Sequence, residues 1–198
     1  GGLAAADDAC RLAQYRLAYA LMNKGDVLRG AEAYDEAVKL LRDPRNSPTP
    51  EQQEKSRALM ESALFNAAAA YSKIKELMVA ADKVAGYQKK ALQTFADFAE
   101  SFPTAKTAPT AMFRSGVLQM MLKESQAANK TFESLGRKFP QSDEAKNVHF
   151  YRIKILLDMG YVMEAKMSVD KMLSNVKEYS AAEFVTVAKM LGERKESE

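Results

Sequence analysis

The residue types that most often carry out chemistry in proteins are rare in this chain. His149 is the only histidine and Cys10 the only cysteine, and they lie far apart in the sequence. A Ser–His–Asp set would have to use His149, and no motif frames it. A metal site needs several converging His, Cys or acidic ligands. We therefore predict no catalytic residue and no metal site, and we interpret His149 as a packed or half-exposed side chain.

The remaining candidates for chemistry have simple structural interpretations. Adjacent acids occur at Asp7-Asp8, Asp35-Glu36 and Asp143-Glu144, but neighbouring residues of a helix point in different directions. Apart from Gly1-Gly2 the glycines are scattered singly, so no phosphate-binding loop is expected. Cys10 follows acids instead of the apolar stretch of a lipoprotein signal, so we expect a plain buried or half-exposed thiol. We predict that the protein is not an enzyme and binds no cofactor.

Composition favours a single helical domain over residues 1–198. The chain has 47% hydrophobic and 28% charged residues, with only 9 Gly and 6 Pro, and it lacks the long β-branched alternation of a sheet. The net charge of +3 is small and scattered, which argues against a nucleic-acid partner. No apolar run reaches the length of a transmembrane segment. We interpret the Gly1-Gly2 start, without Met, as that of a processed or engineered fragment.

The stretch from Phe102 to Leu173 contains one pattern twice. Phe102-Pro103 opens the first copy and Phe139-Pro140 opens the second, 37 residues later. Self-similarity at a period of roughly 20–50 residues indicates a repeat architecture, in which helical pairs bury apolar faces against their neighbours. The proline ends the preceding helix. The matched positions are Gly116 with Ile153, Ala128 with Ala165, Phe132 with Val169, and Leu135 with Met172.

Turn and cap signals divide the chain into helical hairpins. We predict repeats at about 4–44, 50–103, 107–140 and 142–175, followed by a terminal helix over 180–196. Thr49, Ser142 and Ser180 have the form of helix N-caps, and the proline-rich run over 43–50 predicts a loop. The second hairpin is expected to be the longest, with a first helix to about Ala81, a partner from about Val84, and extra turns around 75–89.

These features resemble the tetratricopeptide repeat, a helix–turn–helix of about 34 residues with small residues at the helix contacts, an aromatic in the second helix and a closing proline. The likeness covers about 11–173 and implies an all-α fold: a right-handed α-solenoid of about four such hairpins plus a C-terminal helix. It is carried by Leu17, Ala18, Leu21, Gly25, Asp26, Tyr34, Ala37 and Pro44 in the first hairpin; Ala67, Ala68, Tyr71, Ala91 and Phe95 in the second; Gly116, Ala128, Phe132, Leu135 and Pro140 in the third; and Leu156, Gly160, Ala165 and Met172 in the fourth.

A looser likeness concerns the setting. Phe139-Pro140-Gln141-Ser142, followed by an Ala-containing amphipathic helix, looks like bacterial periplasmic and outer-membrane members of the family, in the Tol–Pal system and in barrel assembly. This likeness favours a bacterial periplasmic or cell-envelope location over a cytoplasmic one.

The family resemblance also implies where a partner binds, because the first helix of each hairpin lines the concave face. Aligning the four units puts an aromatic at one equivalent position in each, and these side chains suit an apolar or amphipathic peptide. The alternative is that the aromatics are internal packing. The predicted partner-binding residues are Tyr15, Tyr19, Met22, Phe65, Asn66, Phe113, Arg114, Val117, Phe150 and Lys154.

Some family members clamp the C-terminal carboxylate of a peptide with Lys, Asn and Arg residues. Here Asn66 and Arg114 fall at two of the clamp positions, whereas Tyr15, Tyr19 and Thr110 occupy others. We therefore do not predict that this chain binds chaperone tails.

The sequence as a whole predicts a non-catalytic scaffold or adaptor that binds a protein or peptide on its concave face. One alternative is an accessory protein for a small molecule or lipid, which an apolar cavity enclosed by Phe65, Phe113 and Phe150 would favour. Another is a structural segment of a larger repeat array or homo-oligomer, which an exposed apolar face around Phe184 and Leu191 would favour.

Overall fold

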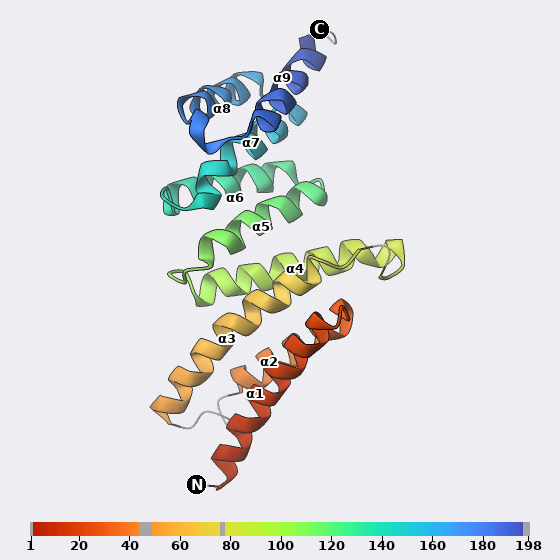
Figure 1. The fold of residues 1–198 in the computed structure, drawn as a ribbon, viewed down its shortest axis with the longest axis vertical. Helices are drawn as coiled ribbons and strands as arrows, with labels where there is room; N and C mark the ends of the chain where they lie inside the picture. Colours follow the sequence, from red (N-terminus) through yellow and green to blue (C-terminus); the bar gives the residue numbers. More distant parts are fainter. Residues whose placement is uncertain (1, 44–48, 76–77, 196–198) are drawn as a thin grey trace. The chain divides into compact units, whose positions relative to one another are not determined.

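Helices joined by short turns and loops make up the described chain, which covers residues 2–43, 49–75 and 78–195 of a computed structural model (Figure 1). Within these ranges consecutive helices pair into hairpins, which confirms the predicted all-α class with a tetratricopeptide-like arrangement. The helices are α1 (Gly2–Asn23), α2 (Val27–Arg42), α3 (Pro50–Tyr71), α4 (Ala81–Ser101), α5 (Ala108–Met121), α6 (Ser125–Lys138), α7 (Asp143–Asp158), α8 (Val162–Ser174), a 3₁₀ turn (Val176–Glu178) and α9 (Ala181–Lys195).

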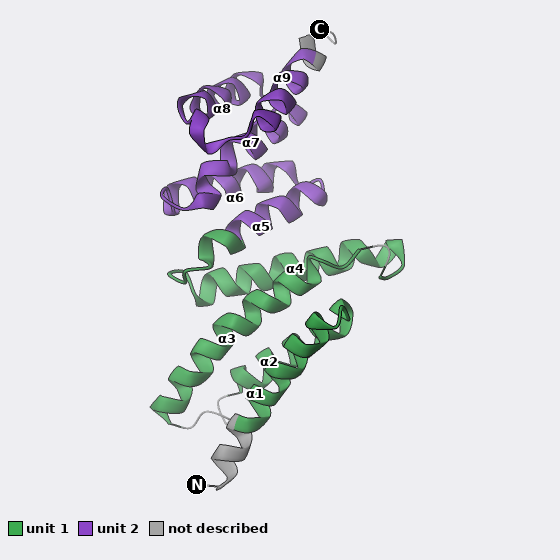
Figure 2. Ribbon diagram, in the orientation of Figure 1, with its two compact units in different colours: residues 1–111 green, residues 112–198 purple. Residues whose placement is uncertain are grey.

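The chain forms two compact units, residues 1–111 and residues 112–198 (Figure 2). The boundary falls inside α5, so unit 1 contains the first two hairpins and unit 2 contains most of the third hairpin, the fourth hairpin and α9. The single domain over 1–198 stays a prediction. Residues 44–48 of the predicted proline-rich loop lie outside the described residues.

The predicted N-caps are confirmed by their hydrogen bonds. The Gln52 backbone N–H donates to Thr49 Oγ1 at 3.3 Å, and the Thr49 backbone N–H donates to Gln52 Oε1 at 3.2 Å. The Ala145 backbone N–H donates to Ser142 Oγ at 3.1 Å. The Glu183 backbone N–H donates to Ser180 Oγ at 3.3 Å, and the Ser180 backbone N–H donates to the carboxylate of Glu183 at 2.7 Å. Side chains thus satisfy donors that a helix start leaves unpaired.

Left-handed backbone at one residue turns the chain in three of the hairpins. Gly25 and Gly160 have φ of +82° and +79° between their helices, and Lys123 has φ of +63° at the same place in the third hairpin. Each turn carries the hydrogen-bond pattern of a left-handed C-terminal cap. The third hairpin therefore makes, with a lysine, a turn that favours glycine.

The two Phe-Pro pairs end their helices in the same way. The C-cap of α4 is Phe102, with φ −135° and ψ 57°, and the C-cap of α6 is Phe139, with φ −132° and ψ 56°. The cap N–H of each donates to a carbonyl four residues back, that of Phe98 or Leu135. The two copies of the sequence pattern thus fold to one local conformation.

The second hairpin differs from its prediction. Helix α3 ends at Tyr71 and not near Ala81, and α4 begins at Ala81 and not near Val84. The Ser72 backbone N–H donates to the carbonyls of Ala68 and Ala70, and Ile74 is buried directly afterwards. The chain thus leaves the helix to bury Ile74, a change that the sequence marks with neither Gly nor Pro.

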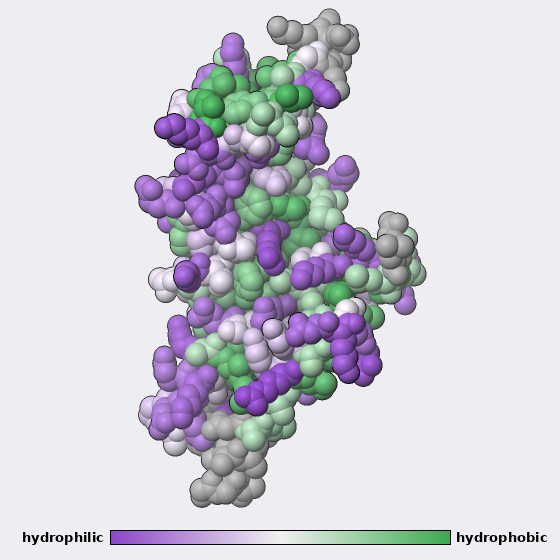
Figure 3. Space-filling model, viewed as in Figure 1, coloured by the Kyte–Doolittle hydropathy of each residue, from purple (hydrophilic) through white to green (hydrophobic). Residues whose placement is uncertain are grey.

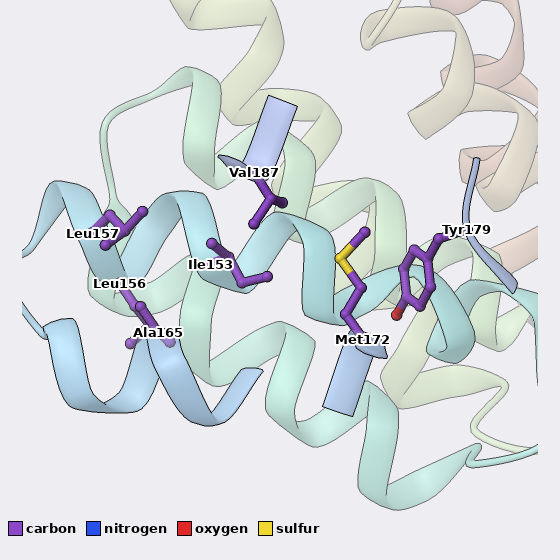
Figure 4. Close-up of a cluster of buried hydrophobic side chains, with 7 residues drawn as sticks. All are labelled: Ile153, Leu156, Leu157, Ala165, Met172, Tyr179 and Val187. Carbon is purple, nitrogen blue, oxygen red and sulfur yellow. The ribbon is translucent and has the colours of Figure 1, made fainter. Parts of the chain in front are cut away.

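Each unit has its own apolar interior. In unit 1 the helix contacts use small residues, and the run from Ala67 to Ala70 is buried as expected. In unit 2 Phe184 and Leu191 pack against a cluster of buried side chains instead of forming an exposed face. Figure 4 shows this cluster, which joins α7, α8 and α9: Ile153, Leu156, Leu157, Ala165, Met172, Tyr179 and Val187.

Candidate functional site

In unit 1 a groove lies over the first helices of the two hairpins. Its volume is about 200 Å³. Three predicted binding residues, Tyr19, Met22 and Asn66, lie in its lining. The remaining lining residues are Asn23, Tyr34, Ala69, Ala70 and Lys73. The structure thus brings together side chains from α1 and α3, which are more than forty residues apart in the sequence.

A hydrogen bond and a ring contact position the polar wall of this unit 1 groove. Asn66 Nδ2 donates to the Tyr15 hydroxyl at 3.0 Å, and the Tyr15 ring meets the Tyr34 ring edge-on at 5.5 Å between centroids. Met22 packs against Gly30 of α2, where an added Cβ would lie 2.7 Å from its sulfur. Tyr19 is 56% exposed. Tyr15 and Met22 therefore support the wall, and Tyr19 is open to a partner.

A second groove lies in unit 2, between α5 and α7, with a volume of about 290 Å³. The predicted residues Val117 and Lys154 line it, and Met121 at its edge is 55% exposed. Apolar atoms and charged ends of both signs meet here, which suits an amphipathic segment. The other lining residues are Met120, Lys123, Ser125, Tyr151 and Asp158.

Three predicted site residues lie outside the linings of these grooves and pack inside their units. The Phe65 ring contacts Phe95 and Phe98 edge-on at 5.9 and 5.7 Å between centroids. The Phe113 ring lies 5.1 Å from that of Tyr151. Phe150 packs against the buried cluster of α7, α8 and α9. All three side chains are half-buried, and their ring contacts agree with the alternative interpretation, internal packing, while their role in binding stays a prediction.

The remaining predicted residue, Arg114, is half-buried on α5 and is also absent from the unit 2 groove lining. The sequence did not single out Tyr151 and Met121, which do line that groove. Tyr151 follows Phe150 directly, and the alignment selected Phe150, the one of these two adjacent aromatics that does not line the groove. Met121 follows Met120, so the Met-Met pair was the available signal.

Burial shifts the pKa values of several side chains in each unit. In unit 1 the Tyr71 hydroxyl donates to Asp35 Oδ2 at 2.6 Å and accepts from Lys90 Nζ at 2.7 Å, and Lys90 also pairs with Asp35. Burial, together with the bond to Asp35, raises the pKa of Tyr71. Burial also raises the pKa of Tyr34 to about 12, with Tyr15 and Tyr19 adding to the effect.

In unit 2 burial lowers the pKa of His149 to about 4, with Lys171 and Arg152 adding to the effect. His149 is half-buried, as predicted. Cys10 is exposed, which corrects the expectation of a buried or half-exposed thiol.

The described residues contain neither a metal-binding cluster nor a membrane-spanning helix. Over the described ranges no three His, Cys, Asp or Glu side chains lie close enough to hold a metal ion. Over the same residues no helix has the length and apolar character needed to cross a membrane.

Comparison with known proteins agrees with this geometry. Residues 110–142 match the model of the tetratricopeptide repeat family. The fold is similar to the crystal structure of a tetratricopeptide repeat protein from Parabacteroides merdae ATCC 43184, with a TM-score of 0.63 and 19% identity over 94% of this chain. This chain covers 62% of that protein. No curated protein sequence matches the chain. Residues 110–142 therefore match a tetratricopeptide repeat, and the chain of helical hairpins has a fold similar to that of a tetratricopeptide repeat protein.

Proposed function

We propose that this protein is a non-catalytic scaffold or adaptor that binds a protein or peptide along the first helices of its hairpins. The observation that carries the proposal is the pair of grooves on these helices, each with a large exposed apolar side chain at its edge. These are Tyr19 in unit 1 and Met121 in unit 2. Apolar anchors next to a few fixed polar groups are typical of peptide recognition.

The polar groups suggest how a bound segment would be held. Asn66 donates to Tyr15 with one amide hydrogen. Its carbonyl oxygen and second N–H have no partner among the described residues and could bond to a peptide backbone. Lys154 is exposed at the wall of the unit 2 groove. A peptide segment would place apolar side chains on Tyr19 or Met121 and polar backbone or acidic groups against these residues.

Photo-cross-linking tests this function directly. A photoreactive phenylalanine analogue replaces Tyr19 or Met121, one at a time, and the control carries it at Met163. Met163 is 71% exposed on α8, the second helix of its hairpin, where hydrophobic surface is visible in Figure 3. The proposal expects one partner cross-linked from Tyr19 or Met121 and none from Met163. Cross-linking from Met163 alone would place binding on the second helices and contradict it.

We further propose that the protein works in the bacterial cell envelope. The support is the likeness of Phe139-Pro140-Gln141-Ser142 to envelope members of the family. Fractionation of the source cells tests this proposal: the protein is expected in the periplasmic fraction, and recovery with cytoplasmic markers would contradict it.

A further inference from the structure

We propose that unit 2 has a second binding site, a cationic cavity between α6, α7 and α8 that takes the oxyanion group, phosphate or carboxylate, of a small ligand. The cavity has a volume of about 540 Å³, within the range of small-molecule sites. It shares no lining residue with the unit 2 groove on α5 and α7. It therefore provides a site separate from the proposed peptide surface.

The charged lining of the cavity is mainly positive. Four cationic side chains, from three helices, face two acidic ones. The cations are Arg137 of α6, Lys146 and Arg152 of α7, and Lys171 of α8; the acids are Glu133 of α6 and Glu178 of the 3₁₀ turn.

The lining acids leave most of these cations without an ion-pair partner among the described residues. Lys146 is the one that pairs with carboxylates, at 3.1 Å to Asp143 and 3.8 Å to Glu178. Arg152 instead donates from Nε to the neutral Asn129 Oδ1 at 2.9 Å. Arg137 and Lys171 have no ion-pair partner among the described residues. Guanidinium groups that keep free donors bind phosphate and carboxylate in a two-pronged geometry.

His149 lies in the lining between these charges, and its buried Nδ1 has no hydrogen-bond partner among the described residues. Burial, Lys171 and Arg152 together keep its pKa near 4. Glu133, Arg137, Lys146 and Glu178 are the other charged groups of the cavity lining. A bound oxyanion offsets the positive field, so its arrival raises the pKa of the imidazole. Because His149 is the only histidine, its ring signal reports this cavity alone.

The test is an NMR titration of the full chain with inorganic phosphate and, separately, with succinate, at constant ionic strength. The proposal expects the His149 ring signal to shift saturably at millimolar anion, with its pKa raised in the saturated state. Saturation by phosphate alone identifies a phosphate ligand, and saturation by succinate alone identifies a carboxylate ligand. A shift that sodium chloride reproduces, or one that never saturates, overturns the proposal.

Two double variants separate the cavity from general surface charge. Arg137→Gln with Lys171→Gln removes two exposed cations of the lining, and about tenfold or greater weakening is expected. Lys130→Gln with Lys166→Gln removes two exposed cations from the same helices, outside the lining, and binding should stay unchanged. Circular dichroism checks that both variants fold. Equal weakening in the two variants would show a nonspecific charge effect and overturn the proposal.

Discussion

Gly116 of α5 lies directly against the ring of Phe132 of α6: a Cβ added at Gly116 would lie 2.6 Å from Phe132 Cζ. In the fourth hairpin the matched residues are Ile153 and Val169, and Val169 packs against the buried cluster that contains Ile153. One pair combines no side chain with a large ring, and the other combines two side chains of middle size. The two hairpins therefore have the same number of side-chain carbons at this contact and divide them differently between its two members.

The first prediction concerns the contact between Gly116 and Phe132. Gly116→Ala should lower the free energy of unfolding by about 1–3 kcal/mol, because the Phe132 ring already occupies the space that the added methyl group needs. Gly116→Ala should cost less when Phe132→Val is already present, because the smaller valine side chain leaves room for the added methyl group. Urea unfolding of the single and double variants measures the coupling between the two sites. Strict additivity would contradict a direct steric contact.

The second prediction concerns the turn at Lys123. A non-glycine residue in the left-handed region costs about 1 kcal/mol, so Lys123→Gly should raise the free energy of unfolding by about that amount. The matched control is Gly160→Ala, at the same place in the fourth hairpin, which should lower it by about 1 kcal/mol. Thermal unfolding of both variants tests the pair, and destabilisation by Lys123→Gly would show that the lysine side chain stabilises its turn.

The third prediction concerns acid stability. The pKa of His149 is about 4 in the folded chain, below the ordinary 6.5, so the unfolded chain binds the proton more tightly. The contribution of His149 to stability is therefore complete above pH 6.5 and is lost as the pH falls towards 4. His149→Gln should remove this part of the pH dependence. Urea unfolding at several pH values measures the free energy of unfolding of the wild type and of the His149→Gln variant. The same pH dependence in both proteins would contradict a buried neutral imidazole.

The fourth prediction concerns the buried hydroxyl of Tyr71. Tyr71→Phe should lower the free energy of unfolding by about 1–2 kcal/mol, because it removes one partner from both Asp35 and Lys90. Tyr87→Phe is the control, since the Tyr87 ring stacks on Tyr71 and its hydroxyl makes no hydrogen bond within the described residues. Equal effects of the two substitutions on the free energy of unfolding, measured with urea, would show that the hydrogen bonds of the Tyr71 hydroxyl to Asp35 and Lys90 do not stabilise the fold.

Much of the fold could be predicted because it follows from local signals. Thr49, Ser142 and Ser180 cap helices through their own side chains, and Phe102 and Phe139 end helices next to a proline. The end of α3 at Tyr71 could not be predicted, because it depends on the burial of Ile74 against the rest of unit 1. Local helix propensity alone extends that helix.

Some of the groove residues could be predicted from the sequence and others could not. Repeat alignment assigns a residue to a helix. It does not tell which of two adjacent residues on that helix faces the groove, because that depends on the rotation of the helix about its axis. It placed Tyr19, Met22 and Asn66 in one groove lining. It also selected Phe150, which packs on the buried cluster, in place of Tyr151, which lines the unit 2 groove. The cationic cavity had no sequence signal, because its charges come from three helices and look like ordinary solvated surface.

The most direct test of the adaptor function is the affinity of the cross-linked partner, measured by isothermal titration calorimetry. Tyr19→Ala with Met121→Ala should weaken binding at least tenfold and leave folding unchanged, because both side chains are more than half exposed. The control, Met163→Ala with Met167→Ala, removes exposed apolar side chains from α8 and should bind like the wild type. Unchanged affinity in the first variant, or a loss confined to the second, would contradict binding along the first helices.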